Sequence, residues 1–583
     1  MQEKFKIYFL LSACGLVFIY LFFVLYKLQI VDHDDYLTRR DNQNKSFNQN
    51  NKRGTIYATR KDGELVPLAI DEVWHKVIVS PRDIPKSYDE RLFDILQQVL
   101  NISTTSTSTT AIGEKQMIGR EQFLKRLSNK SDTYEEVAFV DKAMAEKVEE
   151  LDTFGVYTNK DHKRIYPEMQ IAAKLVGFVG DGEEGIKGKY GLEKFYESDL
   201  SGKGGSRQSF FSQIFSGSNS NSEDISQDII TTIEPNVSKF LHNLLGEMKT
   251  EWAADTVAAI VMKVDTGEIV AMEALPSFDP NKFGEFKIEN FSNPSVNGVY
   301  ELGSIMKPIT MSAGINEKLV TPTTVYRDYG FVKVDEYTIK NFDERVRGEQ
   351  TMQDVISNSL NTGAVYVQQK LGMEKFKKYF DNFGLKDNTE IDFPNEAVNM
   401  VSNLDGHIKV NYATAAFGQG VAVTPISMLS ALNVIVNGGV RVCPHFLKYK
   451  LYSDNTKLNF LCGLDELGDD GKQVISKETA DTTKQMMIEL VEKGLAKGRY
   501  KDKNYFVGAK TGTAQLASPD GKYYKDRFIH SYYMFFPGDK PQYSVLIYQV
   551  NPKQGTLASL TLAPFASKIK DFLLDYYNIP PDR

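Results

Sequence analysis

A serine and a lysine stand three residues apart in the sequence ELGSIMKPIT, residues 301–310. Ser304 follows a glycine and Lys307 precedes a proline, a residue that the first turn of a helix tolerates because the N–H groups there have no internal acceptor. We therefore predict that Ser304 lies at a helix N-terminus, with Lys307 one turn away on the same face. A hydroxyl and an amine so placed could act as a nucleophile and its base.

A lysine can serve as that base only after it has lost its proton. Its reference pKa of about 10.4 must fall by roughly 3, which corresponds to about 4 kcal/mol. Burial or a second nearby cation lowers the pKa of an amine in this way. No histidine lies near Ser304 in the sequence to take the role instead. The hypothesis therefore predicts a second lysine close to Lys307 in space.

Two later stretches supply candidate partners. VGAKTGTAQ places Lys510, Thr511 and Gly512 on a predicted strand whose small residues would let a substrate backbone lie alongside. ISNSLNTGAV supplies a further hydroxyl at Ser359 and an amide at Asn361. Ser-x-x-Lys, a Ser-x-Asn element and Lys-Thr-Gly form one catalytic set when they occur together. The chain contains all three in that order.

Each motif also has a competing match. Ser567 and Lys570 repeat the Ser-x-x-Lys spacing, and we interpret them as the solvent-exposed face of a C-terminal amphipathic helix. The sequence SDN at residues 453–455 lies between KYKLY and KLNFL, so we predict that it forms the turn of a hairpin. Ser359 is preferred as the second-motif serine because it lies between helical patterns, about fifty residues after Ser304.

Hydropathy patterns predict the elements that position these motifs. TVAAIVMKV and EIVAMEAL flank residues 265–267 and predict an antiparallel hairpin. Helical patterns begin at Ser304 and extend again from 352 to 371. Strand-like runs return at NYFVGAKTGTAQ, SYYMFFP and YSVLIYQV, before a last helix over about residues 562–577. Strands at both ends with helices between them predict an α+β domain, one antiparallel sheet covered by helices.

The first half of the chain has a different composition. RGTIYATRKDGELVPLAI predicts a hairpin, and residues 135–151 show an acidic amphipathic pattern that predicts a helix. NISTTSTSTTAIGEK, residues 101–115, has low complexity and is interpreted as an insertion. Gly- and Ser-rich segments between 201 and 227 predict loops. We interpret residues 51–235 as one elongated region.

The first segment predicts a membrane anchor. IYFLLSACGLVFIYLFFVLY, residues 7–26, contains twenty residues without a charge, which is enough to span a hydrocarbon core about 30 Å thick. Lys4 and Lys6 precede it, so the positive-inside rule favours a cytoplasmic N-terminus. LSAC at residues 11–14 resembles a lipoprotein box, but the apolar run continues twelve residues past Cys14. We therefore favour a transmembrane helix.

Composition excludes several classes of function. A net charge of -7 and the lack of a dense Lys/Arg stripe disfavour nucleic acid as a partner. The seven histidines are scattered without metal-ligand spacing, so no metal and no cofactor are expected. Cys443 and Cys462 could pair, but we expect two isolated thiols.

The motifs together resemble a bacterial class B penicillin-binding protein, a membrane-anchored peptidoglycan transpeptidase. YELGSIMKPIT, SLNTG and AKTGTA are similar to the three catalytic motifs of that family. TGEIVAMEALPSFDPN and FGQGVAVTP resemble further blocks of its transpeptidase domain, and RGTIYATRKDGELV and RIYPEMQIAAKLVGFVG resemble its pedestal domain. The resemblance implies a penicillin-binding transpeptidase fold behind an elongated N-terminal pedestal. The implied boundaries are 1–27 for tail and membrane helix, 28–50 for a linker, 51–235 for the dimerisation-type pedestal and 236–583 for the transpeptidase domain.

The resemblance also implies how the first two motifs act. Ser304 would attack the penultimate D-Ala carbonyl of a stem peptide ending in D-Ala-D-Ala, and Lys307 would be its base. Ser359 and Asn361 would relay the proton to the leaving amine and hold the substrate amide. Leu302 stands where many family members have proline, and the reactive atoms are unaffected by that difference.

The third motif would bind the ends of the substrate. The resemblance implies that Lys510 and Thr511 bind the terminal carboxylate and that Lys510 helps to depress the pKa of Lys307. Gly512 and Thr513 belong to the same substrate-binding strand, and the backbone N–H of Thr513 would form an oxyanion hole with that of Ser304.

The resemblance finally implies a cellular role and its partners. We expect a single-pass protein of the bacterial cell membrane with an extracytoplasmic catalytic domain, which β-lactams inhibit covalently. Its partners would be stem peptides, a membrane-embedded glycan polymerase and other division proteins. The length and the absence of large insertions near the active site favour a septal over an elongation-type enzyme. A β-lactamase, a DD-carboxypeptidase, a β-lactam sensor and a non-catalytic division scaffold are the alternatives. The dedicated glutamate of class A β-lactamases has no assignable counterpart in the sequence.

Overall fold

The computed structural model describes residues 52–583, with gaps at 102–103, 106–115, 129, 131–133, 183–184, 203–225, 463–470, 519–521 and 556, together with residues 20, 22 and 26. The predicted membrane helix at residues 7–26, apart from those three positions, and the linker at 28–50 lie outside the described residues. So do most of the predicted insertion at 101–115 and most of the loops at 201–227. Within the described ranges, the helices are all too short or too polar to cross a membrane.

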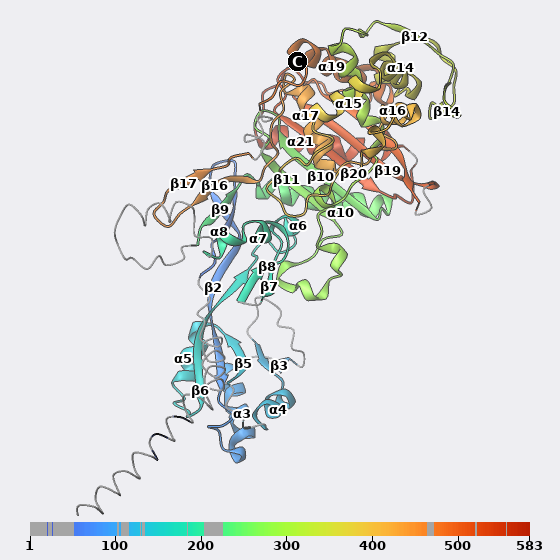
Figure 1. Cartoon of the computed structure of the whole chain (residues 1–583). Coiled ribbons are helices and arrows are strands. Elements are labelled where there is room, and N and C mark those ends of the chain that lie inside the picture. Colours follow the sequence, from blue (N-terminus) through green and yellow to red (C-terminus); the bar gives the residue numbers. More distant parts are fainter. Residues whose placement is uncertain are drawn as a thin grey trace, which may run out of the picture.

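The N-terminal part of the chain is organised along one long strand (Figure 1). β2 (Leu65–Val79) pairs antiparallel with β1 (Ile56–Thr59) near its start, and with β5 (Glu135–Val140) and β6 (Val156–Ile165) further along. The hairpin predicted from RGTIYATRKDGELVPLAI is confirmed by the pairing of β1 with β2. Because one strand serves both ends of this part, the part is elongated.

The helix predicted for residues 135–151 is wrong over its first half. Glu135–Val140 forms strand β5, and only Lys142–Glu149 is helical, as α5. Val137 and Val140 are fully buried in a core that also contains Phe93 and Phe123. Pairing with β2 and burial of these β-branched side chains therefore outweigh the local helical pattern.

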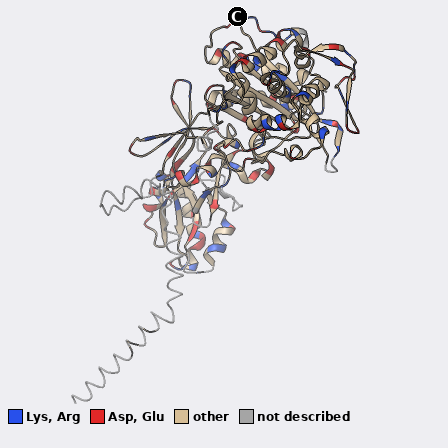
Figure 2. Cartoon of the chain, turned by 45° about the horizontal axis from the view of Figure 1, so that its top comes forward, with Lys and Arg blue, Asp and Glu red and all other residues tan. Residues whose placement is uncertain are grey.

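The other elements of the N-terminal part are short. They are η2 (Lys86–Tyr88), α3 (Asp89–Leu100), β3 (Thr104–Thr105), β4 (Gln116–Ile118), α4 (Arg120–Ser128), α6 (Ala173–Val176), β7 (Val179–Gly182), β8 (Gly185–Gly188), α7 (Gly191–Phe195), α8 (Glu197–Leu200) and β9 (Asp228–Thr231). Basic and acidic residues are interspersed over both parts of the molecule (Figure 2).

A hairpin from the second half of the chain extends the sheet of the first half. β16 (Leu447–Leu451) pairs antiparallel both with β17 (Lys457–Asn459) and with β9, which in turn runs parallel to β1. The predicted turn at residues 453–455 joins β16 and β17 and is confirmed. Thr456 N donates to Asp454 Oδ1 across it at 2.8 Å. The two halves therefore share one sheet as well as one continuous hydrophobic core.

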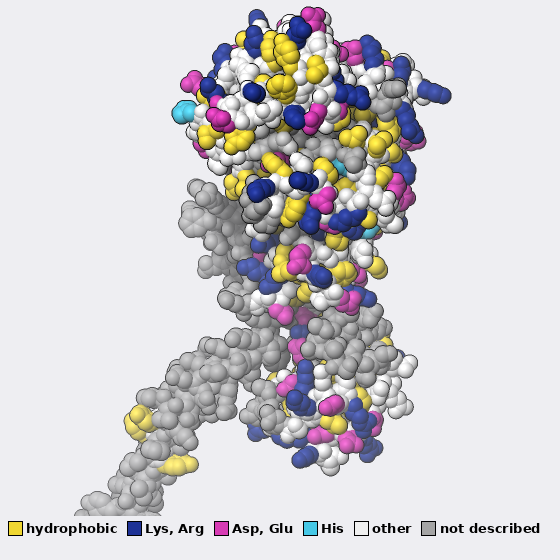
Figure 3. Space-filling view, turned by 90° about the vertical axis from the view of Figure 1, so that its right-hand side faces the viewer, with side chains coloured by type: hydrophobic (Ala, Val, Ile, Leu, Met, Phe, Trp, Pro, Cys, Tyr) yellow, Lys and Arg dark blue, Asp and Glu magenta, His cyan; other side chains and the backbone are white. Residues whose placement is uncertain are grey.

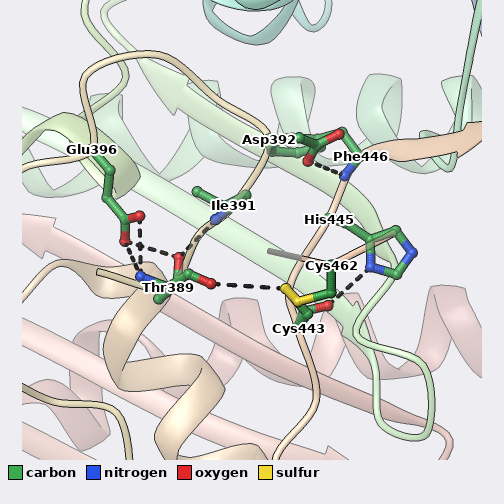
Figure 4. The surroundings of a disulfide bond; sticks show 8 residues. All are labelled: Thr389, Ile391, Asp392, Glu396, Cys443, His445, Phe446 and Cys462. Carbon is green, nitrogen blue, oxygen red and sulfur yellow. Dashed lines mark hydrogen bonds between the residues drawn. A yellow bond between two sulfur atoms is a disulfide. The ribbon is translucent and has the colours of Figure 1, made fainter. Parts of the chain in front are cut away.

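The expectation of two isolated thiols is wrong. Cys443 and Cys462 form a disulfide with Cα atoms 6.1 Å apart (Figure 4). Cys443 precedes β16 and Cys462 follows β17, so the hairpin returns the chain to its starting point. Both cysteines are buried, and His445 stacks on Phe460 beside them, with ring centroids 4.1 Å apart.

Removal of this disulfide is expected to destabilise the protein. It closes a loop with a sequence separation of 19, for which constraint of the unfolded chain contributes about 3 kcal/mol. Replacing both cysteines by serine should lower the free energy of unfolding by about this amount, measured by chemical denaturation. Reductant should destabilise the wild type to a similar extent and leave the double variant unchanged. Equal stability of the wild type and the variant would contradict the prediction.

The C-terminal part is built around one antiparallel sheet. Its strands lie in the order β11 (Ile269–Leu275), β10 (Thr256–Lys263), β20 (Tyr543–Val550), β19 (Tyr523–Phe536) and β18 (Gly508–Ala517). The predicted hairpin formed by β10 and β11 is confirmed, as are the three late strands. β18, which carries the Lys-Thr-Gly motif, is the edge strand.

Helices cover both faces of this sheet. Ser544 of β20 donates to Asn433 of α17 (Pro425–Val436) at 3.0 Å. Gln549, at an odd spacing from Ser544 and thus on the other face, bonds to His530, which contacts Thr561 of α20 (Ala558–Thr561). The predicted α+β arrangement is confirmed.

The described residues of the C-terminal part also form further helices and short strands (Figure 1). They are α10 (Pro235–Trp252), η3 (Pro280–Glu285), η4 (Ile288–Asn290), α11 (Pro294–Asn297), η5 (Gly303–Met306), α12 (Lys307–Asn316), β12 (Val325–Asp328), β13 (Phe331–Val334), β14 (Tyr337–Lys340), β15 (Gly348–Thr351), α13 (Met352–Ser357), α14 (Asn361–Leu371), α15 (Met373–Asn382), η6 (Ser402–Leu404), α16 (Lys409–Ala415), α19 (Lys477–Glu489), η7 (Leu490–Gly494), η8 (Leu495–Gly498) and α21 (Ala563–Tyr576).

Candidate active site

Ser304 lies in a helical turn, η5, that leads directly into α12. The turn begins at Gly303, whose φ of +63° lies in the left-handed region that favours glycine. Two neighbours fix the backbone before Ser304. Leu302 O accepts from Ser531 Oγ at 2.8 Å, and Gly303 N donates to Gly418 O at 3.3 Å. The nucleophile candidate is therefore held against the β18–β19 edge of the sheet while its side chain keeps partial exposure.

Lys307 is the first residue of α12 and is only 1% exposed. Its Nζ lies 2.9 Å from Ser304 Oγ, 2.6 Å from Ser359 O, 2.8 Å from Asn361 Oδ1 and 3.1 Å from Ser359 Oγ. The Ser359 carbonyl and the Asn361 amide oxygen can only accept, so a neutral amine would give them both of its N–H groups. Its lone pair is then left for a hydroxyl, and Ser304 Oγ is the nearer of the two.

The surroundings of Lys307 favour that neutral form. Burial, and then the charge of Lys510, hold the pKa of Lys307 well below its usual value. No carboxylate is paired with either lysine in the described part of the chain, so nothing there offsets the cost of burying their charge. Burial lowers the pKa of Lys510 to about 7.

Ser359 lies between α13 and α14, at a break in the helical pattern predicted for residues 352–371. Its φ is +55°, a conformation that non-glycine residues adopt at a cost and that often occurs at functional sites. Its hydroxyl is shared by two amines, with Lys307 Nζ at 3.1 Å and Lys510 Nζ at 3.0 Å. Asn361 then begins α14 with its side chain beside Lys307.

The third motif lies on edge strand β18 opposite β19. Lys510 is 1% exposed and donates to Thr511 O at 3.0 Å as well as to Ser359 Oγ. Gly512 has no room for a side chain, since a Cβ there would lie 2.3 Å from Leu302 O and 2.3 Å from Ser531 Oγ. Thr513 Oγ1 accepts from the backbone N–H of Ala558 at 3.3 Å. The strand thus packs directly on the turn that carries the serine.

The three motifs meet in one place although they are far apart in the sequence. Lys510 is 151 residues from Ser359, yet their side chains are in contact. No group of three or more His, Cys, Asp or Glu side chains suited to a metal ion is found among the residues that the structure covers. Chemically, the cluster offers two hydroxyls, the Lys307 amine with a strongly depressed pKa and the Lys510 amine with a pKa lowered by burial to about 7.

The competing Ser-x-x-Lys match has the opposite electrostatics. The interpretation of Ser567 and Lys570 as a solvent-exposed face is wrong for Lys570, which is 6% exposed. Lys570 forms salt bridges with Asp502 and with Asp571, the latter at 2.7 Å. These carboxylates raise the pKa of Lys570 against the effect of burial. Lys570 is therefore favoured in its charged form and poorly suited to act as a base, whereas Lys307 has no such carboxylate partner in the part of the chain that the structure describes.

One contact of the site could not be read from the sequence. Asn361 Nδ2 donates to the backbone carbonyl of Lys340 at 2.9 Å. A backbone oxygen leaves no signature in side-chain spacing, and Lys340 lies 21 residues before Asn361. The contact between Asn361 and Lys340 is therefore known only from the folded structure.

Two family models match the chain. The penicillin binding protein transpeptidase domain matches residues 257–570, and the penicillin-binding protein dimerisation domain matches residues 48–223. Among curated relatives, stage V sporulation protein D of Bacillus subtilis is 30% identical over 502 residues, covering 84% of this chain and 76% of that protein. Peptidoglycan D,D-transpeptidase FtsI of Escherichia coli is 23% identical over 580 residues, covering 98% and 92%.

Solved structures give the same fold. Penicillin binding protein 3 of Mycobacterium tuberculosis, in its apo form, matches with a TM-score of 0.64 and 25% identity, covering 72% of this chain and 92% of that one. The same protein complexed with aztreonam matches with a TM-score of 0.64, covering 73% and 92%. A peptidoglycan synthetase from Bifidobacterium adolescentis matches with a TM-score of 0.68 and 20% identity, covering 91% and 96%.

Proposed function

The chain belongs to the class B penicillin-binding proteins, and from that premise we propose that Ser304 performs D,D-transpeptidation on peptidoglycan stem peptides through an acyl-enzyme. The chain is a serine D-Ala-D-Ala transpeptidase by its family. The roles of its residues are the proposal. The observation that carries them is the position of the Lys307 amine, 2.9 Å from Ser304 Oγ and bonded to two carbonyl-type oxygens.

The reaction begins at Ser304. Lys307 Nζ takes the proton of the hydroxyl while Oγ forms a bond to the penultimate D-Ala carbonyl carbon. The resulting oxyanion would face the backbone N–H groups of Ser304 and Thr513. A proton then passes by way of Ser359 Oγ to the leaving nitrogen, the C–N bond breaks and D-Ala departs. An amine of a second stem peptide attacks the ester, loses a proton to the site and restores the serine.

Lys510 has a different task from Lys307. Its amine contacts Ser359 Oγ, and it stands on the edge strand along which the donor peptide would lie, next to Thr511. As a cation it would hold the terminal carboxylate of the donor, with Thr511 and Thr513 beside it. Gly512 lets the strand that carries these residues pack closely on the turn of Ser304. Binding of that carboxylate raises the pKa of Lys510 and so favours the charged form that the role requires.

The pH dependence of acylation separates these two tasks. Acylation needs neutral Lys307, so the rate falls as pH drops through the depressed pKa of Lys307. It also needs protonated Lys510, so the rate falls as pH rises through about 7, the pKa of Lys510 in the free enzyme. A bell-shaped profile of the second-order rate constant is expected with a fluorescent penicillin. Lys510→Arg should lose the alkaline limb and keep the acid limb, because arginine stays charged. An unchanged alkaline limb in that variant would contradict the assignment.

Gly512 tests the packing of the strand on the nucleophile turn. An alanine Cβ would collide with Leu302 O and Ser531 Oγ, so Ser304 must shift relative to Lys307. Gly512→Ala is expected to lower the acylation rate by about 10²-fold. The matched control is Gly246→Ala in helix α10, where an added Cβ meets nothing within 4 Å, and this variant should react at the wild-type rate. Equal rates for both variants would contradict the prediction.

We further propose a septal role at the bacterial cell membrane. The predicted helix at residues 7–26 would anchor the chain, with residues 28–50 as linker, 51–235 as pedestal and 236–583 as an extracytoplasmic catalytic domain. The two family models match residues 48–223 and 257–570, which supports these boundaries between the pedestal and the catalytic domain. A membrane-embedded glycan polymerase and other division proteins would be its partners. Imaging a tagged copy tests the role, since a uniform sidewall signal would indicate elongation instead.

A reaction of purified protein tests the activity itself. The protein is incubated with a stem peptide ending in D-Ala-D-Ala and a peptide that carries a free acceptor amine, and mass spectrometry follows the products. Cross-linked dimer with release of D-Ala is the expected result. Hydrolysed donor without dimer would indicate a carboxypeptidase, rapid turnover of penicillin a β-lactamase, and absence of any adduct a scaffold.

A further inference from the structure

Residues 325–351 form an arm of two short two-stranded sheets beside the helices of the second motif (Figure 1). β12 pairs antiparallel with β15, and β13 pairs antiparallel with β14. The arm projects on the right-hand side of Figure 1. The face on that side, which Figure 3 shows, mixes hydrophobic with charged side chains. None of the three catalytic motifs belongs to the arm. The part of the arm that bears on the reaction is its buried base, here called the root, which contains Asp328 and Asn341.

The root of the arm contains a buried carboxylate, Asp328, which is 1% exposed. Its Oδ1 accepts from Gly330 N at 2.9 Å and from Thr362 Oγ1 at 2.9 Å. Asn341 Nδ2 donates to both oxygens of Asp328, each at 3.1 Å. All of these donors are neutral, and together they hold the Asp328 carboxyl group in one orientation.

Two of these partners connect Asp328 to the second catalytic motif. Thr362 directly follows Asn361 in the first turn of α14, where backbone N–H groups lack an acceptor within the helix. Asn341 Oδ1 supplies that acceptor, since Thr362 N lies 3.2 Å from it. Asp328 and Asn341 together therefore fix the start of α14 from the arm side.

The residue before Asn341 reaches the site itself. Lys340 O accepts from Asn361 Nδ2 at 2.9 Å, while Asn361 Oδ1 lies 2.8 Å from Lys307 Nζ. The amide of Asn361 is thus oriented by the arm, with its nitrogen toward Lys340 and its oxygen toward Lys307. A reversed amide would bring two donors, Nδ2 and Nζ, against each other. The Lys307 lone pair would then be drawn to the amide instead of to Ser304.

We propose that Asp328 is a positioning residue for the acyl transfer, an inference that rests on the proposed function. Through Asn341 it fixes the carbonyl of Lys340, and that carbonyl selects the orientation of the Asn361 amide. In that orientation Asn361 Oδ1 accepts one N–H of Lys307, which leaves the lone pair of the amine for Ser304. The arm is therefore part of the catalytic apparatus although it carries none of the reacting groups.

The test replaces Asp328 by asparagine, which has the same shape but turns one acceptor into a donor. Asn341 Nδ2 lies 3.1 Å from both oxygens of Asp328, so in either orientation of the new amide its NH₂ group faces a group that can only donate, and one hydrogen bond of the arm is lost. Acylation by a fluorescent penicillin is expected to slow by about 10- to 100-fold. The acid limb of the pH profile should move to lower pH, because a donor facing Lys307 disfavours its charged form.

A swap of the two groups provides the rescue. Asn341→Asp alone places two carboxylates side by side and should also be slow. The double variant with Asp328→Asn and Asn341→Asp restores one donor against one acceptor, so it should react faster than either single variant. Thr362→Val, which loses the hydroxyl that contacts Asp328, Asn341 and Tyr326, should be slow, and Thr362→Ser, which keeps that hydroxyl, should react as the wild type. This last pair decides the question if Asp328→Asn fails to fold.

The matched control is Asp392→Asn. Asp392 is also buried, at 4% exposure, and accepts from Phe446 N and Leu447 N, each at 2.7 Å, at the start of β16. That variant should melt earlier and keep the wild-type pH profile of acylation. The proposal is overturned if folded Asp328→Asn acylates at the wild-type rate, if its pH profile is unchanged, or if Thr362→Val and Thr362→Ser react equally. Failure of the proposed function itself would appear separately, as a wild type that does not react with penicillin.

Discussion

Ser304→Ala is expected to abolish both covalent labelling by penicillin and formation of cross-linked peptide. The change removes one oxygen and leaves Lys307, Ser359 and Lys510 in place. The loss should be at least about 10⁴-fold, because the amine then has no substrate hydroxyl to ionise. Gel fluorescence with a labelled penicillin measures the adduct, and mass spectrometry of the digested adduct locates it on the peptide that contains residue 304.

The geometry makes this a discriminating experiment, because a second hydroxyl also lies next to the amine. Ser359 Oγ is 3.1 Å from Lys307 Nζ, against 2.9 Å for Ser304 Oγ. Ser359→Ala should therefore still form an adduct, only more slowly, since the proton relay to the leaving group is lost. The control Ser567→Ala, in the competing Ser-x-x-Lys match, should label as the wild type. Label retained in Ser304→Ala would exclude Ser304 as the nucleophile.

The sequence was sufficient to predict the architecture of the C-terminal part because its signals are local. The β10–β11 hairpin follows from two apolar runs around a turn at Asp265–Gly267, and β19 and β20 are runs rich in β-branched and aromatic residues. The residues of the candidate site follow from short spacings within three motifs. Their meeting in space does not, since the contact of Lys510 with Ser359 depends on the whole intervening chain.

Two of the sequence-based errors share a physical cause, which is that the deciding partner is distant in the chain. Val137 and Val140 belong to a strand because β2 is available to pair with it. The pairing of Cys443 with Cys462 is a different case, because the hairpin between them was predicted from the sequence and already brings the two cysteines together. Lys570 is buried because Asp502, 68 residues away, neutralises it. A local pattern does not contain these partners, so it cannot predict their effect.

Lys307→Arg is expected to be as inactive as Lys307→Met, with acylation slower by about 10²- to 10⁴-fold in both. Arginine keeps a cation at this position, but its pKa above 12 leaves no lone pair to receive the proton of Ser304. Burial already depresses the pKa of Lys307, with Lys510 adding to the effect, so the wild-type residue is suited to the neutral form. Stopped-flow measurement of penicillin acylation gives the rates, and thermal melting shows whether each variant is folded.

The comparison of these two variants distinguishes a base from a binding cation. If Lys307 served only to attract an anionic substrate, arginine would preserve much of the rate and methionine would not. Arginine would also preserve it if another group deprotonated Ser304, for example Lys510 acting through Ser359 Oγ, which lies within 3.0 Å of the Lys510 amine. A folded Lys307→Arg protein that acylates within about tenfold of the wild type would therefore reassign the proton transfer. A rate equally low in both variants, at every pH, leaves the neutral Lys307 amine as the group that ionises the serine.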